Sequence, residues 1–238
     1  MSAVVATRRP ASPTAVLGLQ YGNPNRMIGV PVYILGGVVL LSIVIVGVIR
    51  RAGGDGDASD FNASVLWSLL GYTVVLGVQN VSASFPFALA LGATRRTFVL
   101  GNLLTSLLQA LLVALGSVVL LGVEAVTGGW FLGARILGTT LLGAGDPLVL
   151  GGIMLLTMLA ALSVGSVFGA SWVRFGAIGP LLLGVGLVVV GLALLLLVLL
   201  PGTPVPAFRP WWLPVAGAAV IGAATVGQYL LLRRAAVR

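Results

Sequence analysis

The chain contains no cysteine, no histidine and no lysine. Without cysteine it forms no disulfide, and without cysteine and histidine it lacks the usual ligands of a zinc site. Catalysis of the Ser-His-Asp or Cys-His kind also requires histidine and is therefore excluded. We expect no metal site in this chain.

Charge is also scarce, because only 8% of the 238 residues are Asp, Glu, Lys or Arg while 59% are hydrophobic. A soluble domain carries about 25% charged residues, so these few cannot solvate a globular surface. The high apolar fraction also excludes intrinsic disorder. The composition predicts that most of this protein is surrounded by lipid.

The 13 arginines and five acidic residues give a net charge of +8, but they do not indicate a nucleic-acid partner. The arginines occur singly or in pairs between apolar segments and form no basic face. The absence of lysine beside abundant Ala, Gly, Val, Arg and Pro is typical of a GC-rich bacterial genome. We therefore expect a bacterial protein that binds no nucleic acid.

Six segments are long and apolar enough to cross a membrane as helices of about 20 residues. The fold class predicted is an all-α, polytopic membrane protein with six transmembrane helices. The run from Gly176 to Leu200 is the clearest of them, and the segment around residues 61–83 is the most polar. The six predicted spans are residues 27–49, 61–83, 98–122, 148–170, 176–200 and 213–232.

The arginines predict the orientation of these spans, since cytoplasmic loops carry an excess of Lys and Arg. With residues 1–26 as a cytoplasmic or interfacial N-terminal segment, both termini are cytoplasmic. The inner side then collects Arg8, Arg9, Arg26, Arg95, Arg96, Arg174, Arg233, Arg234 and Arg238. The outer side collects Arg50, Arg51, Arg135, Arg209, Asp55, Asp57, Asp60, Glu124 and Asp146. The three aspartates of the first outer loop are best interpreted as a solvated turn.

No ionisable residue lies at the middle of a predicted span, which argues against an ion-coupled antiporter. Uncharged polar side chains instead follow one face of the second and third spans. We predict that they line a pathway for an amphipathic or lipid-like substrate, although hydrogen bonding between helices explains any single one of them. The set is Ser68, Tyr72, Gln79, Asn102, Thr105, Ser106 and Gln109.

Small residues four apart, Ala161, Gly165 and Gly169, indicate close helix packing in the fourth span. Packing within the chain is the favoured interpretation, and a subunit interface is the alternative. The outer connection Val123–Pro147 contains enough apolar residues for an interfacial or re-entrant helix, which would act as an anchor or a gate.

The segment between the second and third spans carries the most local information. Pro86 suits the first turn of a helix, so we predict a short helix over Pro86–Leu91. Gly92 is a natural helix stop, and Thr94 is suited to cap the next helix. Arg95 and Arg96 then lie in the first turn of that helix, where the macrodipole disfavours cations. Contact with anionic lipid or docking onto a cytoplasmic protein would each account for them.

This segment resembles the first cytoplasmic loop of bacterial ATP-binding-cassette (ABC) permeases of the type-2 exporter class. The six-span layout and the closing Leu230–Arg234 are also similar to that family, in which an amphipathic helix usually precedes the first span. Residues 11–26 of this chain show no clean polar face. The matching residues are Phe87, Ala88, Leu89, Leu91, Gly92, Arg95, Arg96, Phe98, Leu100 and Gly101.

The resemblance implies a permease subunit, because the chain has no GxxxxGK[ST] phosphate loop and cannot hydrolyse ATP itself. ATP and Mg²⁺ would bind a separate ABC ATPase, and a second permease chain would complete an exporter in the bacterial cytoplasmic membrane, among its lipids. The ATPase-coupling residues would be Pro86, Phe87, Leu89, Leu91, Gly92, Arg95 and Arg96.

Two other classes compete with the permease. An intramembrane enzyme would need a cluster of reactive side chains near a span end, but the sequence offers only the isolated Glu124 and Asp146. We therefore expect no enzyme activity in this chain. A non-catalytic scaffold, immunity or assembly protein is the alternative function, because composition alone does not distinguish it from a permease.

Overall fold

The computed structural model describes residues 12–53, 63–199 and 212–235, and in these ranges the regular elements are helices. Short turns join them at η1 (Asn25–Gly29), η3 (Gly129–Gly133) and η4 (Thr140–Leu142). The α-helices are α1 (Pro13–Gln20), α2 (Val30–Arg51), α3 (Ala63–Ala90), α4 (Arg95–Val126), α5 (Pro147–Phe175), α6 (Ile178–Leu199) and α7 (Trp212–Leu232).

Five of the predicted spans are confirmed as helices with the length and composition of membrane crossings. They are η1 with α2, α3, α4, α5 and α7. The sixth candidate is α6, of which Ile178–Ala193 is apolar but shorter than a span. Six crossings therefore stay a prediction. The predicted turn at Asp55, Asp57 and Asp60 lies outside the described residues.

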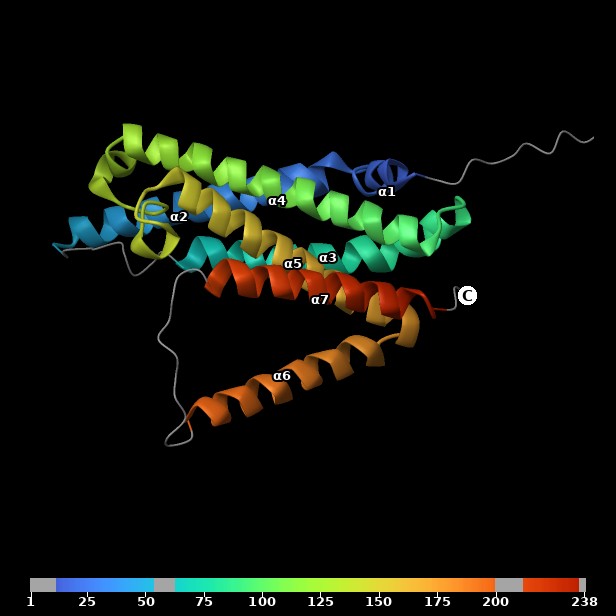
Figure 1. Ribbon diagram of the computed structural model, residues 1–238. Helices are drawn as coiled ribbons and strands as arrows, with labels where there is room; N and C mark the ends of the chain where they lie inside the picture. Colours follow the sequence, from blue (N-terminus) through green and yellow to red (C-terminus); the bar gives the residue numbers. More distant parts are fainter. Residues whose placement is uncertain (1–11, 54–62, 200–211, 236–238) are drawn as a thin grey trace, which may run out of the picture.

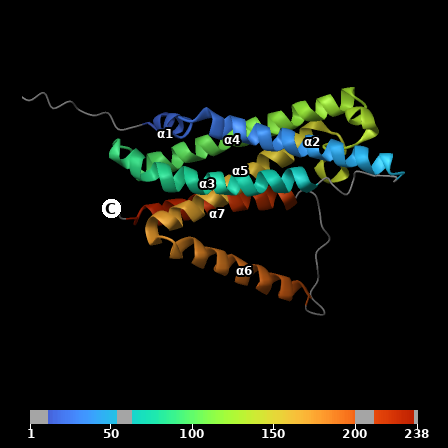
Figure 2. The same ribbon diagram turned by 180° about the vertical axis from the view of Figure 1, so that it is seen from behind.

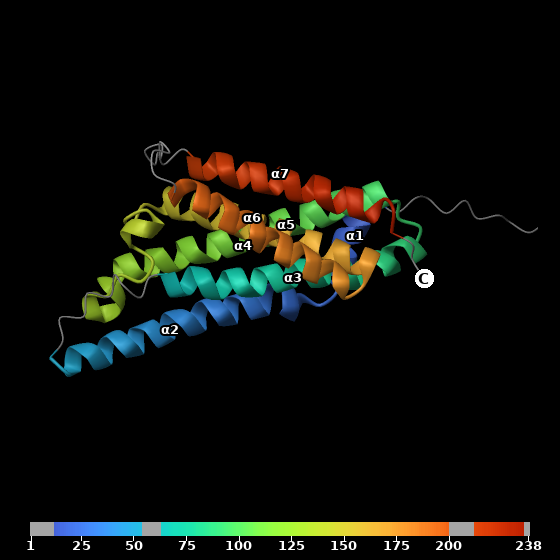
Figure 3. The ribbon, with the colours of Figure 1, turned by 90° about the horizontal axis from the view of Figure 1, so that it is seen from below.

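The five long helices run side by side as a bundle, whereas α6 diverges from it (Figures 1 and 2). We name the two ends of the bundle by their key residues. At the Arg95 end, the start of α4 packs with the ends of α3, α5 and α7 around Phe85 and Phe98. At the Glu124 end, the end of α4 packs with α2 and the starts of α3 and α5. Seen from below, α1 lies at the Arg95 end and α2 extends toward the opposite end (Figure 3).

The closest helix pair is α3 with α5, and glycine makes it possible. A Cβ atom at Gly165 would collide with the carbonyl oxygen of Val74, and one at Gly77 would lie 2.5 Å from the carbonyl oxygen of Leu162. Gly169 faces the carbonyl oxygen of Val78 in the same way, at 2.5 Å. The predicted packing of this stripe within the chain is therefore confirmed.

The predicted helix start at Pro86 is wrong, because α3 continues through Pro86 to Ala90. Proline removes one helical hydrogen bond and crowds the preceding turn. Both effects fall on the last turns of α3, where the helix is about to end and Pro86 itself is exposed. The proline therefore does not divide the helix.

The outer connection is also different from the predicted interfacial or re-entrant helix. Between α4 and α5 the chain forms only the short turns η3 and η4, joined by residues 134–139, which form no regular element. It folds back on the bundle, where Ala134, Ile136, Leu137 and Leu142 are buried. Five glycines in this connection have positive φ angles, which prevent a regular helix from forming.

The Gly165→Ala substitution tests the contact between α3 and α5. The added methyl group would overlap the backbone of α3, and we expect a loss of about 2 kcal/mol or more in the free energy of unfolding. Gly152→Ala is the matched control on α5, because no atom lies within 4 Å of its Cβ position. Thermal unfolding of the purified protein in detergent, followed by helical circular dichroism, measures both. Equal melting temperatures for the two variants would contradict this packing.

Candidate functional site

The hairpin formed by α3 and α4 is longer than the hydrocarbon layer of a membrane is thick. The two helices contain 28 and 32 residues, which rise about 42 and 48 Å, whereas the hydrocarbon layer is about 30 Å thick. Arg26, at the start of the first span, donates a hydrogen bond to Gln79 of α3. From Gln79 to the end of α3 at Ala90 the helix rises about 16 Å further. The tip of the hairpin therefore extends well past the level of Arg26.

The turn at the tip follows the predicted chemistry. Gly92 has φ +89° and its amide donates to Leu89, while the Ala93 amide donates to Ala88 at 3.0 Å. This pair of bonds is the Schellman ending of a helix. The Thr94 hydroxyl then accepts a hydrogen bond from the amide of Thr97 at 3.1 Å and caps α4. The predicted stop at Gly92 and cap at Thr94 are both confirmed.

Arg95 has a specific partner that the sequence did not reveal. Its guanidinium donates to the carbonyl oxygens of Leu232 at 3.0 Å and Ala235 at 2.9 Å, and also to that of Arg233. Leu232 is the last residue of α7, and Arg233 and Ala235 follow it, so these carbonyls lie where the helix ends. A cation is favourable at that helix end. Arg95 is therefore unfavourable for its own helix but favourable for α7, and it ties the hairpin to α7.

The other predicted coupling residues separate into two groups. Leu89 packs inward against the core at this end, and Arg95 is held by its hydrogen bonds at the end of α7. The exposed group includes Phe87 at 60% and Leu91 at 56%, which lie four residues apart and so share one side of the helix end. The remaining members of the exposed group are Pro86, Gly92 and Arg96. The tip thus exposes the apolar side chains of Phe87 and Leu91 and the guanidinium of Arg96.

The helix α1 lies on the part of the hairpin next to its tip, although its sequence showed no clean amphipathic pattern. Ser12 caps it and Pro13 occupies its first turn, which are the local signals that could have identified it. Val16 is buried, and a Cβ at Gly101 of α4 would lie 2.6 Å from the Val16 Cβ. The glycine at position 101 therefore allows α1 to lie directly on α4.

A buried polar cluster fastens the end of α1 to four helices. The side-chain amide of Gln20 donates to the Asn80 carbonyl, the Ser84 hydroxyl and the Asn102 side chain, each at 3.1 Å. The Asn102 amide in turn donates to Ser166 at 3.0 Å. It also lies 3.5 Å from the Gln228 oxygen. Asn102 thereby links α1, α4, α5 and α7.

A second group of hydrogen bonds holds the turn between α1 and α2. The Tyr21 hydroxyl donates to Gln109 at 3.2 Å, and the Gln109 amide donates to the Met27 carbonyl at 2.6 Å. The Tyr72 hydroxyl donates to the Arg26 carbonyl at 2.5 Å. Burial raises the pKa of Tyr21 to about 12, so its hydroxyl keeps its proton, and its role as donor, at neutral pH.

The predicted pathway residues are therefore brought together mainly around α1 and η1. Asn102, Thr105, Ser106 and Gln109 are buried, whereas Ser68 is exposed and separate. Gln109 also lines a mostly apolar cavity of about 160 Å³ between α2 and α4. Their role as a pathway stays a prediction. The partners Gln20, Ser84, Ser166 and Gln228 were not predicted, because their contacts join distant parts of the chain.

No protein-family model, curated protein or solved structure matches this chain. The resemblance to type-2 permeases thus depends on the residues quoted above, and function has to be inferred from the geometry of the site.

The link between Arg95 and α7 predicts a local effect of substitution. In Arg95→Gln the carbonyls at the end of α7 lose their charged donor, and we expect amides of residues 229–235 to exchange with deuterium about tenfold faster. Arg96→Gln is the matched control, because Arg96 is exposed. Hydrogen–deuterium exchange with mass spectrometry measures both variants. Equal exchange in the two variants would show that Arg95 does not hold α7.

The buried cluster predicts a global effect. Asn102→Leu leaves the amide of Gln20 and the hydroxyl of Ser166 without this partner, and we expect a loss of about 2 kcal/mol or more in the free energy of unfolding. Ser68→Leu, at an exposed position of α3, should change it by less than about 0.5 kcal/mol. Unfolding of both variants in detergent tests this. An Asn102→Leu protein of unchanged stability would favour a pathway role for Asn102 instead.

Proposed function

We propose that this chain is the membrane permease subunit of an ATP-driven exporter, and that the α3–α4 hairpin tip is its contact with a separate ABC ATPase. The proposed cargo is amphipathic or lipid-like, since the described spans carry polar but no ionisable side chains at their middles. The observation that carries the proposal is the hairpin tip itself. It extends beyond the bundle at one end, and it exposes apolar side chains there.

Exposed apolar groups at the tip favour a protein partner over solvent. Phe87 and Leu91 are more than half exposed at the end of a hairpin that rises about 16 Å past Arg26. Apolar side chains outside the hydrocarbon layer gain stability when a partner covers them. Arg96 is exposed in the first turn of α4, after the same turn, and would select an acidic rim on that partner.

The same geometry supports transmission of a movement from the tip. Arg95 joins the start of α4 to the end of α7 by charge-assisted hydrogen bonds. A partner that pushes the tip therefore displaces two spanning helices together. This arrangement suits a subunit that converts a movement of its ATPase into a rearrangement of the bundle.

The order of the helices supports six crossings. The ends of α5 and α7 share the cluster around Phe85 and Phe98, so both helices finish at the Arg95 end. The chain between them must therefore return to the Glu124 end, and α6, with 22 residues, rises about 33 Å. We propose α6 as the remaining crossing, which places both termini on the same side.

The charges of the described residues suggest which side is cytoplasmic. The loops and helix termini at the Arg95 end carry Arg95, Arg96, Arg174, Arg233 and Arg234. Those at the Glu124 end carry Arg50, Arg51 and Arg135 together with Glu124 and Asp146. By the positive-inside rule the Arg95 end faces the cytoplasm, where an ATPase would be found.

Purification of the tagged chain from its own membranes in mild detergent tests the proposal. We expect an ATPase to copurify with it in equimolar amount. The double substitution Phe87→Ser with Leu91→Ser should lower the amount of copurified ATPase about tenfold or more. Val126→Ser is the matched control, because Val126 is 89% exposed at the opposite end.

Mass spectrometry identifies the partner, and ATP hydrolysis is assayed on the same sample. A chain that purifies without an ATPase, and whose tip variants change nothing, would overturn the proposal and favour a scaffold, immunity or assembly protein.

A further inference from the structure

The Glu124 end contains a buried carboxylate that has no part in the proposed contact with an ATPase. Glu124 is 4% exposed, and its Oε2 atom accepts hydrogen bonds from the Trp130 indole at 3.1 Å and the amides of Ile136 at 3.1 Å and Leu137 at 2.8 Å. Its Oε1 atom accepts one bond, from the amide of Gly138 at 2.9 Å. Both oxygens act as acceptors, as in an ionised carboxylate.

This carboxylate organises the loop around it. Trp130 and Phe131 have φ angles of 57° and 61°, which are costly for bulky residues and persist only where the surroundings fix them. The hydrogen bond from the Trp130 indole to Glu124 is one such restraint. The other three bonds, from the amides of residues 136–138, hold this part of the loop against the end of α4. The loop therefore has one defined shape around the carboxylate.

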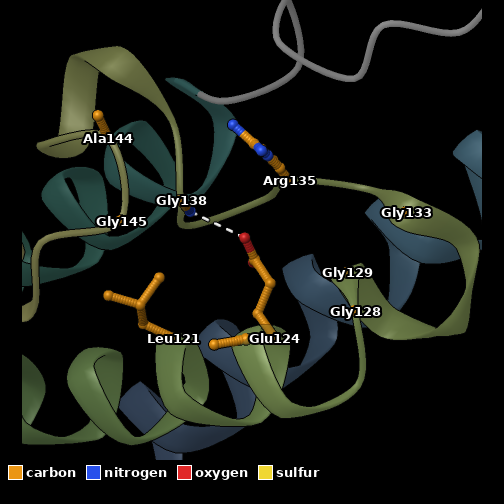
Figure 4. Close-up of a pocket in the computed structure, with 10 residues that line it drawn as sticks. Leu121, Glu124, Gly128, Gly129, Gly133, Arg135, Gly138, Ala144 and Gly145 are labelled. Atoms are coloured by element: carbon orange, nitrogen blue, oxygen red, sulfur yellow. Dashed lines mark hydrogen bonds between the residues drawn. The ribbon is translucent and has the colours of Figure 1, made fainter.

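A cavity of about 460 Å³ opens beside Glu124. Figure 4 shows Glu124 reaching from α4 toward Gly138, with Arg135 on the loop above it. Glycine and alanine form most of the walls, so a ligand meets the backbone at close range. The lining residues are Leu121, Glu124, Ala125, Gly128, Gly129, Gly133, Arg135, Gly138, Ala144 and Gly145.

The charged groups around this cavity are of both signs. A carboxylate offers about four acceptor positions, and Oε1 receives a single donor, so Oε1 has a second position without a donor among the described residues. Arg135 lines the same cavity. The guanidinium of Arg50 lies 3.5 Å from the Cβ position of Gly133, another lining residue. The carboxylate is thus deep in the wall and guanidinium groups lie nearer the surface.

We propose that this cavity binds a zwitterion in which a primary ammonium and a phosphate are joined by a short linker. The ammonium would donate to Oε1 of Glu124, and the phosphate would lie at Arg135, whose planar fork matches its oxygens. A simple anion would be repelled by Glu124, and a quaternary ammonium has no N–H to donate. The described residues contain no cluster of metal-binding side chains, and Glu124 alone does not hold a metal ion.

Aminoethyl phosphate is the smallest group with this chemistry, and it can be presented by a membrane lipid or by a free solute. The cavity lies about a helix length away from the hairpin tip, so this inference does not depend on the ATPase contact. Binding to the purified full-length chain in detergent is measured by titration calorimetry. The probes are dihexanoyl phosphatidylethanolamine, dihexanoyl phosphatidylcholine, dihexanoyl phosphatidylglycerol and phosphoethanolamine.

We expect saturable binding of the phosphatidylethanolamine, about tenfold or more tighter than of the phosphatidylcholine and phosphatidylglycerol. Arg135→Gln should weaken it by about tenfold. Ala125→Phe fills the cavity from α4 without removing a hydrogen bond of Glu124, and should abolish it. Val126→Phe is the matched control, because Val126 is the next residue and does not line the cavity. This variant should bind the phosphatidylethanolamine with an affinity within about twofold of that of the unchanged chain.

Tight binding of phosphoethanolamine alone would identify a free solute as the source, and binding of the lipid alone would identify a headgroup. Equal affinity for the three lipids, unchanged binding by Ala125→Phe, or no saturable binding of any probe would overturn the proposal. Thermal unfolding of each variant confirms that it is folded. Retention of the partner ATPase reports on the proposed function independently of this cavity.

Discussion

The structure depends on the mismatch between two long helices and a thin hydrocarbon layer. α3 and α4 rise about 42 and 48 Å, whereas lipid covers about 30 Å of them. The excess at the Arg95 end needs another cover, and α1 with the ends of α5 and α7 supplies it. The side-chain amides of Gln20 and Asn102 are buried between these helices. There they form hydrogen bonds with protein groups, which lipid chains could not provide. Gln20 and Asn102 are thus satisfied by protein contacts at this end of the bundle.

Arg95 completes this cover by joining the start of α4 to the end of α7. The first turn of α4 and the last turn of α7 lie together, so opposite poles of two helix dipoles meet. The guanidinium between them donates to the carbonyl of Leu232 and to those of two residues that follow it. Because the arginine belongs to the hairpin and the carbonyls lie at the end of α7, neither can move far alone. Arg96, one residue later, is exposed and has a separate role in the proposed docking.

Sequence reasoning succeeded where one physical property decided the structure. Hydrophobicity located five spans, and the local chemistry of Gly92 and Thr94 located the end of α3 and the start of α4. It failed at Pro86, whose effect depends on how soon the helix ends, and at the outer connection. There, the positive φ of Trp130 depends on a carboxylate six residues earlier in the chain. The partners of Gln20 are 60 to 82 residues away and leave no local pattern.

The contacts within the bundle differ in how readily they can be exchanged. Backbone contact through Gly77 and Gly165 leaves no space between α3 and α5, so this pair can separate but not slide. The polar cluster is different, because the Oε1 of Gln20, the Nδ2 of Asn80 and the Nε2 of Gln228 are buried without a hydrogen-bond partner among the described residues. Unused donors and acceptors beside used ones allow one hydrogen bond to replace another at little cost. A movement imposed on α4 would therefore shift it with α1 and α7 against the fixed pair of α3 and α5.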